Sequence, residues 1–284
     1  MTDVFEEHRR LLFGTAYRML GSVADAEDIV QDAWITWNRA DRTDVEHPKA
    51  YLVRTVTNLS LNRLKSAQAV RESYVGPWLP EPLLTSPDVA EEAELADTVS
   101  MAVLVVLETL TPTERAVFML REVFGYSYAE IAEVVGKSGA SVRQSAHRAR
   151  EHVQARRPRF TADVGEQREI AEKFREACTG GDLGAVLELL APDVVSWSDG
   201  GGIVTAARRP LHGHDNVARW WLGVLAKPEV RDGEMRVAEI NGEPGLLLVH
   251  SGVTVGALTF EAVDGRITAL RIAVNPQKLR GIQD

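Results

Sequence analysis

Residues 128–151, "YAEIAEVVGKSGASVRQSAHRARE", decide how the middle of the chain folds. A short apolar-periodic run ends at Gly136, which suits a tight turn, and Ser138 can cap a second helix. In that second helix small apolar residues recur at three- to four-residue spacing and should face inward: Val142, Ala146 and Ala149. The pattern predicts a helix-turn-helix.

The second helix leaves polar residues on its outward face: Arg143, Gln144, His147, Arg148 and Glu151. Arginine pairs well with guanine edges and glutamine with adenine, and arginine also binds phosphates. Such a helix suits the major groove of DNA. An ordinary helical hairpin on a protein surface is the alternative interpretation of the same pattern.

Charge is unevenly distributed in this chain of 284 residues, whose formal net charge is −9. Residues 49–71 contain five Lys or Arg and no acid, and residues 137–159 contain seven with only Glu151 opposing them. Residues 72–114 contain nine acids and no Lys or Arg. Two separated cationic surfaces are typical of nucleic-acid binding, although solvated helix faces are the alternative.

The N-terminal part, residues 1–71, also has a helical pattern. Ser22 is a predicted N-cap and Pro48 suits a first helical turn. The basic segment carries a polar set suited to bases and phosphates: Arg54, Asn58, Asn62 and Arg63. This part is therefore predicted to be a helical domain.

Three further segments complete the predicted organisation. Residues 72–98 form a linker, because four prolines in "GPWLPEPLLTSP" favour an extended backbone. Residues 99–160 form a second helical domain, in which "TPTE" (111–114) predicts a capping box. Residues 166–284 begin with helices and continue with strand-like runs, which predicts an α+β domain with a curved antiparallel sheet.

Composition narrows the class of protein. Cys178 is the single cysteine, so an internal disulfide is excluded and a buried apolar role is expected. We find no signal-peptide core and no apolar run of membrane-spanning length. We therefore expect a soluble, cytoplasmic protein that needs no metal or other cofactor.

Three quoted segments together resemble regions 2 and 4 of a bacterial extracytoplasmic-function (ECF) RNA polymerase sigma factor. "GSVADAEDIVQDAWITWNRA" and "HPKAYLVRTVTNLSLNRL" resemble region 2, and "LTPTERAVFMLREVFGYSYAEIAEVVGKSGASVRQSAHRARE" resembles region 4. The resemblance covers most of residues 5–157, in the expected order. It implies promoter-specific transcription initiation with the polymerase core and promoter DNA as partners.

The resemblance also implies roles for individual residues. Residues implied to bind the polymerase clamp are Asp25, Asp28, Gln31 and Asp32. Residues implied to capture the melted −10 element are Arg54, Asn58, Asn62 and Arg63, next to the segment 38–52. Residues implied to read the −35 element are Ser141, Arg143, Gln144, Ser145, His147 and Arg148.

The C-terminal part resembles the SnoaL-like, NTF2-type cone that a subgroup of these sigma factors carries. Three short signatures of that subgroup are present: "WLPEP" at 78–82, "DGGG" at 199–202 and "NPQKL" at 275–279. In the subgroup this extension is thought to regulate the sigma factor from within the chain. Residues expected at a regulatory interdomain contact are Trp78, Leu79, Pro80, Asp199, Gly200, Asn275, Pro276 and Lys278.

This contact is predicted in some detail. Trp78 should be exposed on a proline-stiffened peptide, and Lys278 should reach the acidic linker. We expect Trp78, Asp199, Asn275 and Lys278 to lie close together.

Two other functions fit parts of the sequence. One is a helix-turn-helix repressor with a ligand-binding domain, and a small-molecule ligand in the cone cavity is open in either case. The other is a SnoaL-like enzyme tethered to DNA, with candidate residues Asp199, His212, His214, Asp215 and His250. Because fold analogy is weak and no tyrosine follows Tyr128, we predict a non-enzymatic protein.

Overall fold

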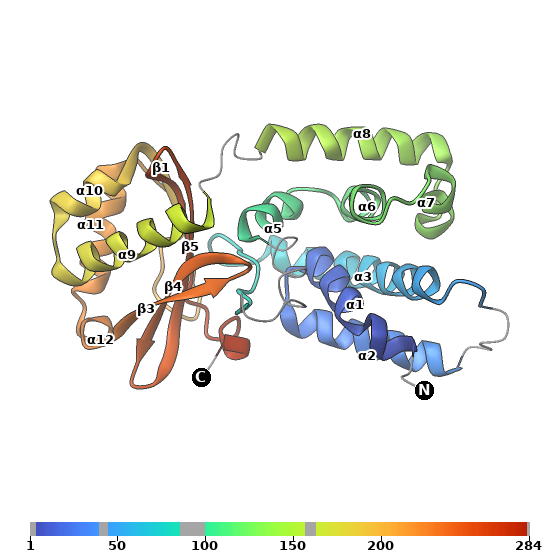
Figure 1. Ribbon diagram of the computed structural model, residues 1–284, viewed down its shortest axis with the longest axis horizontal. Helices are drawn as coiled ribbons and strands as arrows, with labels where there is room; N and C mark the ends of the chain where they lie inside the picture. The colour runs from blue at the N-terminus through green and yellow to red at the C-terminus, as the bar shows by residue number, and fades with distance from the viewer. Residues whose placement is uncertain (1–3, 40–44, 86–99, 157–162, 283–284) are drawn as a thin grey trace. The chain divides into compact units, whose positions relative to one another are not determined.

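A computed structural model describes residues 4–39, 45–85, 100–156 and 163–282. The chain divides into two compact units, whose elements are shown in Figure 1. The helical unit comprises Met1–Ser73 and Val103–Arg157, and the sheet unit comprises Tyr74–Ala102 and Pro158–Asp284. The predicted linker is thus not a separate body, because its first part belongs with the C-terminal domain.

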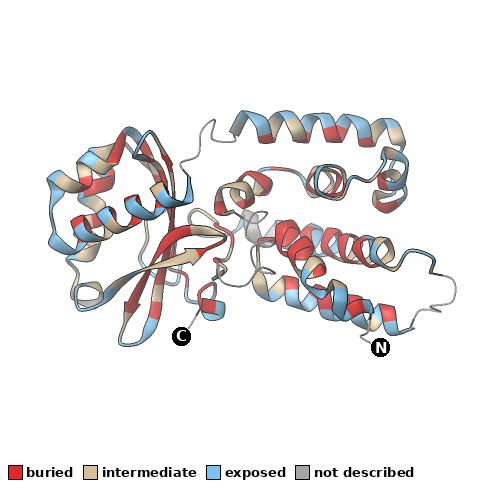
Figure 2. Ribbon diagram, in the orientation of Figure 1, coloured by how far each residue is buried: buried red, intermediate tan, exposed pale blue. Residues whose placement is uncertain are grey.

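Three helices form the first part of the helical unit. They are α1 (Val4–Leu20), α2 (Val23–Arg39) and α3 (Pro48–Glu72), and each packs on the other two. Gly21 ends α1 with φ +64°, and the Ser22 hydroxyl accepts a hydrogen bond from the backbone N–H of Asp25, as an N-cap does. The apolar stripes of all three helices meet in one core (Figure 2).

The second part of the helical unit contains the predicted helix-turn-helix. It follows α5 (Met101–Glu108) and comprises α6 (Pro112–Phe118), the π-helical turn η2 (Met119–Val123), α7 (Tyr128–Val135) and α8 (Gly139–Arg156). Thr111 and Glu114 form the predicted capping box. The structure differs from the sequence prediction in that the helix before Gly125 ends in a π-turn.

A buried arginine ties the two parts of the helical unit together. Arg115, on α6, donates a hydrogen bond of 2.6 Å to the carbonyl oxygen of Met19 on α1. The same guanidinium pairs with Glu108 at 2.5 Å. A buried cation needs both a counter-ion and hydrogen bonds, and Arg115 has both.

The sheet unit is an α+β cone. Its six strands are ordered β2-β1-β6-β5-β4-β3, and every neighbouring pair is antiparallel except β1 with β6. The strands are β1 (Leu190–Asp199), β2 (Leu211–His212), β3 (Glu234–Ile240), β4 (Glu243–His250), β5 (Val253–Val263) and β6 (Arg266–Ala273). The helices are α9 (Val164–Gly180), α10 (Leu183–Leu189), α11 (His214–Leu225) and α12 (Pro228–Arg231).

The main core of this unit lies between the helices and one face of the sheet (Figure 2). Phe174 of α9 and Trp221 of α11 meet edge to face there, with ring centroids 6.1 Å apart. Cys178 is buried in the same core, and burial raises the pKa of its thiol to about 12, as expected for an unreactive cysteine. A smaller apolar cluster on the opposite face includes Leu279 and Ile282, so the C-terminal segment is packed on the sheet.

Candidate functional site

The outward face of α8 is built by its buried stripe. Val142, Ala146 and Ala149 face the core as predicted, which leaves Arg143, Gln144, His147 and Arg148 exposed. Ser145 contradicts the prediction, because only 5% of it is exposed. It follows Val142 by three positions and therefore lies within the same buried stripe.

Ion pairs hold some of the α8 arginines and leave others available. Arg148 pairs with Glu114 at 2.8 Å, and Arg150 pairs with Glu122 at 2.7 Å. Arg143, by contrast, has no side-chain partner among the residues that the structure describes. Arg143 thus presents an unopposed guanidinium near the start of the helix, where a recognition helix contacts bases.

A second polar face runs along α3. Arg54, Asn58 and Asn62 follow one another at four-residue spacing, so they lie on one side of the helix. Arg54 and Asn62 are exposed and Asn58 is half-buried. Arg54 also lies 3.7 Å from Glu133 of α7, within the helical unit.

The acidic face of α2 includes the residues expected to bind polymerase. Asp28, Gln31 and Asp32 are exposed, and Asp25 is half-buried. Arg63 of α3 donates two hydrogen bonds to one oxygen of Asp25 and lies 3.8 Å from Asp28. Arg63, which is predicted to capture the −10 element, is therefore ion-paired with Asp25 and Asp28, which are predicted to bind the polymerase clamp.

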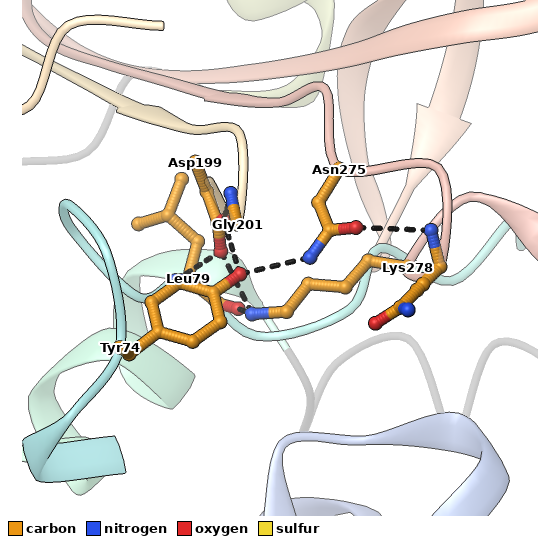
Figure 3. A network of polar contacts seen from close by, with 7 residues as sticks. Tyr74, Leu79, Asp199, Gly201, Asn275 and Lys278 are labelled. Carbon is orange, nitrogen blue, oxygen red and sulfur yellow. Dashed lines mark hydrogen bonds and ion pairs between the residues drawn. The ribbon is translucent and has the colours of Figure 1, made fainter. Parts of the chain in front are cut away.

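In the sheet unit, Asp199 is the centre of a buried network shown in Figure 3. It ends β1, and its carboxylate accepts hydrogen bonds from four donors. The donors are the Tyr74 hydroxyl at 2.5 Å, the Lys278 ammonium at 2.7 Å, and the backbone N–H groups of Leu79 at 2.8 Å and Gly201 at 3.2 Å. We call the set Tyr74, Trp78, Leu79, Asp199, Asn275 and Lys278 the linker clasp.

Lys278 makes three contacts, two of which connect the linker to the domain. Its ammonium pairs with Asp199, donates to the carbonyl oxygen of Leu79, and lies 3.9 Å from the centre of the Trp78 ring. Asp199 is fully buried and Lys278 is 7% exposed. A buried ion pair with this many hydrogen bonds satisfies both charges, and the aromatic face adds a cation–π contact.

Tyr74 completes the network from the linker side. Its hydroxyl donates to Asp199 and accepts a hydrogen bond of 2.9 Å from the side-chain amide of Asn275. Burial and then the hydrogen bond to Asp199 raise the pKa of this phenol above its usual value. The clasp therefore contains a neutral tyrosine, a carboxylate and an ammonium group.

The linker is attached to the domain a second time, further along. Leu83 and Thr85 hydrogen-bond to the edge of β3 and its following turn, through Glu239 and Asn241. Pro80 between the two attachments is buried, as is Pro82. The "WLPEP" segment thus lies against the domain as an extended strap.

The structure brings together the four residues that were expected to meet, and it differs from the expectation in the exposure of Trp78. Trp78 is half-buried rather than exposed, because Lys278 lies over its ring. Lys278 pairs with Asp199 and donates a hydrogen bond to the linker backbone at Leu79, while the acid-rich residues 88–97 lie outside the described residues. Pro276 is exposed, whereas Asn275 and Lys278 on either side of it point inward.

Sequence reasoning missed Tyr74, although it expected the glycines to allow a close approach of the backbone. The available signal was a phenol four residues before Trp78, at the end of the first helical block. Gly201 has φ +61°, and a β-carbon on it would lie 2.3 Å from the Asn275 side chain. The "DGGG" signature thus provides the close approach that the clasp requires.

The geometry gives little support to catalysis by residues of the sheet unit. Asp199 is unsuited to act as a general base, because its carboxylate is fully hydrogen-bonded and ion-paired. Within the described ranges no group of three His, Cys, Asp or Glu residues could hold a metal ion. The described helices include none that is both long and apolar enough to cross a membrane.

Three family models match the chain in order. Sigma-70 region 2 matches residues 4–70, Sigma-70 region 4 matches residues 100–153, and the SnoaL-like domain matches residues 171–273. The first two matches coincide with the helical unit, and the third lies within the sheet unit.

Similar proteins share the same organisation. The ECF RNA polymerase sigma factor SigJ of Mycobacterium tuberculosis is 38% identical over 98% of this chain and 92% of that protein. The probable ECF sigma factor SigI of the same species is 32% identical over 98% of this chain and 94% of its own length. The match to the crystal structure of SigJ spans the full length of both chains, with 34% identity and a TM-score of 0.79. The chain therefore belongs to the ECF RNA polymerase sigma factors and carries a SnoaL-like domain after region 4.

Proposed function

We propose that this sigma factor is regulated in cis by its SnoaL-like domain, which restrains the connector between regions 2 and 4. The observation that carries the proposal is the linker clasp, in which Lys278 and Asp199 hold Leu79 of that connector. The family assignment supplies the activity, which is promoter-specific transcription initiation with the polymerase core. A protein that works with RNA polymerase on chromosomal DNA acts in the cytoplasm.

Chain length shows why docking of the connector matters. Released residues 73–100 could extend to roughly 95 Å, which would allow the two regions to bind promoter elements far apart. With residues 74–85 fixed on the domain, the chain after Thr85 could extend to only about 50 Å. Docking therefore limits the separation of regions 2 and 4, and release of the clasp should raise activity.

Tethering makes even a weak clasp effective. A domain attached to the same chain meets the connector at an effective concentration near the millimolar range. The clasp excludes water from an ion pair and four hydrogen bonds, so the docked state should be the populated one without a partner.

Residue roles on the helical unit follow from its exposed faces. We assign −35 recognition to the exposed side of α8, with Arg143, Gln144, His147 and Arg148 as readers and Ser141 as a phosphate contact. We assign −10 capture to the α3 face that includes Arg54 and Asn62, and clamp binding to the acidic face of α2.

Run-off transcription with polymerase core tests the regulatory proposal. Trp78→Ala removes the aromatic surface under Lys278 and leaves the buried ion pair in place, so the connector should dock less firmly. We expect more promoter-specific transcript from this variant than from the parent. Pro276→Ala is the matched control, since it changes an exposed residue of the same C-terminal signature. Equal transcription by all three proteins would refute regulation through the clasp.

A ligand in the cone is a second proposal, supported by one cavity. A hollow of about 630 Å³ lies at the ends of α9 and β3–β5, with apolar walls that include Met235, Leu248 and Val255. The Nδ1 atom of His250, which lines it, is buried with no hydrogen-bond partner among the described residues. A ligand that forms a hydrogen bond with this Nδ1 atom would shift the His250 imidazole signals in an NMR titration. His250→Phe would abolish binding.

A further inference from the structure

The loop that follows β1 encloses a separate cavity of about 330 Å³. One wall is the glycine loop itself, with Gly200 and Gly202, and another is the segment that ends at Arg208. The third wall is the linker, which contributes Val75 and Gly76. We call this space the glycine-loop cavity.

Glycines hold these walls close together. A β-carbon on Gly200 would lie 2.5 Å from the carbonyl oxygen of Val204, and one on Gly202 would lie 3.1 Å from the Val75 side chain. Gly76 has φ +85°, and a β-carbon there would lie 3.7 Å from the Arg208 backbone. The linker and the loop therefore pack against each other around the cavity, and neither can move without opening it.

The polar groups of the cavity are hydroxyls and one cation. Ser198 is 1% exposed, and its hydroxyl has no hydrogen-bond partner in the part of the chain that the structure describes. Arg208 is exposed and forms no ion pair with a described residue. Among the described lining residues there is no carboxylate. Asp199 is adjacent in sequence, but its charge is neutralised by Lys278.

We propose that the glycine-loop cavity binds a small organic carboxylate. The Arg208 guanidinium matches a carboxylate in charge and can bind it through two hydrogen bonds. The hydroxyl of Thr205, an exposed residue of the lining, can donate to the same anion. Val75 and Ala206 offer apolar contact to the rest of the molecule. A volume equal to about ten water molecules limits the ligand to roughly ten non-hydrogen atoms.

The position of this site predicts its effect on the linker. A bound carboxylate would contact both the linker and the domain, so it binds the docked form better than the released form. Linkage then requires that the ligand stabilise docking and that docking raise the affinity for the ligand. This regulatory consequence rests on the proposed cis regulation, whereas the binding itself does not.

An NMR titration of the full chain with sodium benzoate tests the binding. We expect saturable shifts of the Gly76, Gly200 and Gly202 amides, and no shift of Gly181, which lies at the far end of α9. Neutral benzamide should give at least tenfold weaker binding, because it lacks the charge that Arg208 recognises. Butyrate, a smaller carboxylate, should shift the same amides.

Two adjacent arginines provide a matched pair of variants. Arg208→Gln should weaken benzoate binding at least tenfold, while Arg209→Gln, exposed but outside the lining, should bind as the parent does. Thr205→Val should weaken binding without altering the amide shifts of the free protein elsewhere. If no carboxylate gives a saturable shift, or if Arg208→Gln and Arg209→Gln behave alike, the site is occupied by water only and the proposal is wrong.

Transcription distinguishes failure of this proposal from failure of the cis-regulatory one. Benzoate should lower run-off transcription by the parent and have less effect on Trp78→Ala, in which docking is already weakened. Binding without any effect on transcription would keep the carboxylate site and refute its coupling to the clasp. If Trp78→Ala changes transcription but benzoate does not bind, the cis-regulatory proposal is kept and the carboxylate site is refuted.

Discussion

Arg148 and Glu114 form an ion pair of 2.8 Å on the helical unit, and Lys278 and Asp199 form one of 2.7 Å in the sheet unit. The distances are nearly equal, but the surroundings differ. The Arg148 side chain is about half exposed, whereas the Lys278–Asp199 pair is excluded from water. Surface pairs contribute about 0–1 kcal/mol, while removal of one partner from a buried pair costs about 3–5 kcal/mol.

The difference matches the role that we propose for each unit. Arginines that contact DNA must exchange a carboxylate partner for a phosphate or base, and a weak surface pair allows this at little cost. A clasp that holds a connector must persist until something displaces it, and burial provides that persistence. Four predictions test or refine this contrast.

The first prediction concerns the clasp. Asp199→Asn leaves the Lys278 ammonium buried without its counter-ion, so unfolding of the sheet unit should become easier by about 3–5 kcal/mol. Denaturant unfolding followed by tryptophan fluorescence measures the change. Asp193→Asn, an exposed change in the same strand, should have little effect. Combining Asp199→Asn with Lys278→Met should restore part of the loss, and additive losses would contradict a coupled pair.

The second prediction concerns Glu243 on the sheet. Burial, and then repulsion by Glu261, raises the pKa of Glu243 to about 7. The folded chain therefore holds this proton up to about pH 7, while the unfolded chain releases it near pH 4.3. Stability should fall as pH rises between these values, and Glu243→Gln should remove roughly 2–3 kcal/mol of that loss at pH 8.

Unfolding curves at pH 5 and pH 8 measure this effect. The Gln variant should gain stability over the parent at pH 8 and show no comparable gain at pH 5. Glu188→Gln, at an exposed position, serves as the control and should change neither value. A gain that is independent of pH would point to packing instead of the Glu243 charge.

The third prediction concerns base recognition by α8. Arg143→Ala should weaken promoter binding by holoenzyme by about 1–3 kcal/mol if the side chain contacts a base. Ser145→Ala should leave promoter affinity unchanged, because Ser145 faces the core. Binding assays on promoters with single substitutions in the −35 element measure both. If Arg143→Ala lowers affinity equally for all −35 sequences, Arg143 contacts the phosphate backbone and not a base.

The fourth prediction concerns a surface pair between the two parts of the helical unit. Arg54 and Glu133 lie 3.7 Å apart with both side chains about half or more exposed, so their coupling should be below about 1 kcal/mol. A double-mutant cycle with Arg54→Ala and Glu133→Ala measures it by denaturant unfolding. Coupling well above this value would make the pair a latch between the −10 helix and the helix-turn-helix.

Local patterns predicted the helical unit well. The caps at Ser22 and Thr111 form as predicted, and Gly21 and Gly136 adopt the left-handed conformation that ends a helix. These features depend on neighbours within four residues, so sequence spacing is enough to predict them. Ser145 was placed wrongly because a helix stripe is several residues wide, and only packing shows where its edge lies.

The linker clasp depends on contacts between distant residues. The short signatures indicated that Trp78, Asp199, Asn275 and Lys278 would meet, but gave neither the burial of Trp78 nor the part of Tyr74. Tyr74 and Asp199 are separated by 125 positions, and no local pattern relates them. The pairing of Asp199 with Lys278 depends on the sheet, which places this carboxylate next to the ammonium group.

Residue types at short, fixed spacings were enough to predict the helices, the helix-turn-helix, the basic faces and the membership of the sigma family. Three features became visible only in the folded chain: residues 74–85 lie against the SnoaL-like domain, Asp199 neutralises Lys278, and the glycine loop encloses a cavity with a wall formed by the linker. Burial of charge depends on everything that surrounds a residue, and that information is spread over the whole chain.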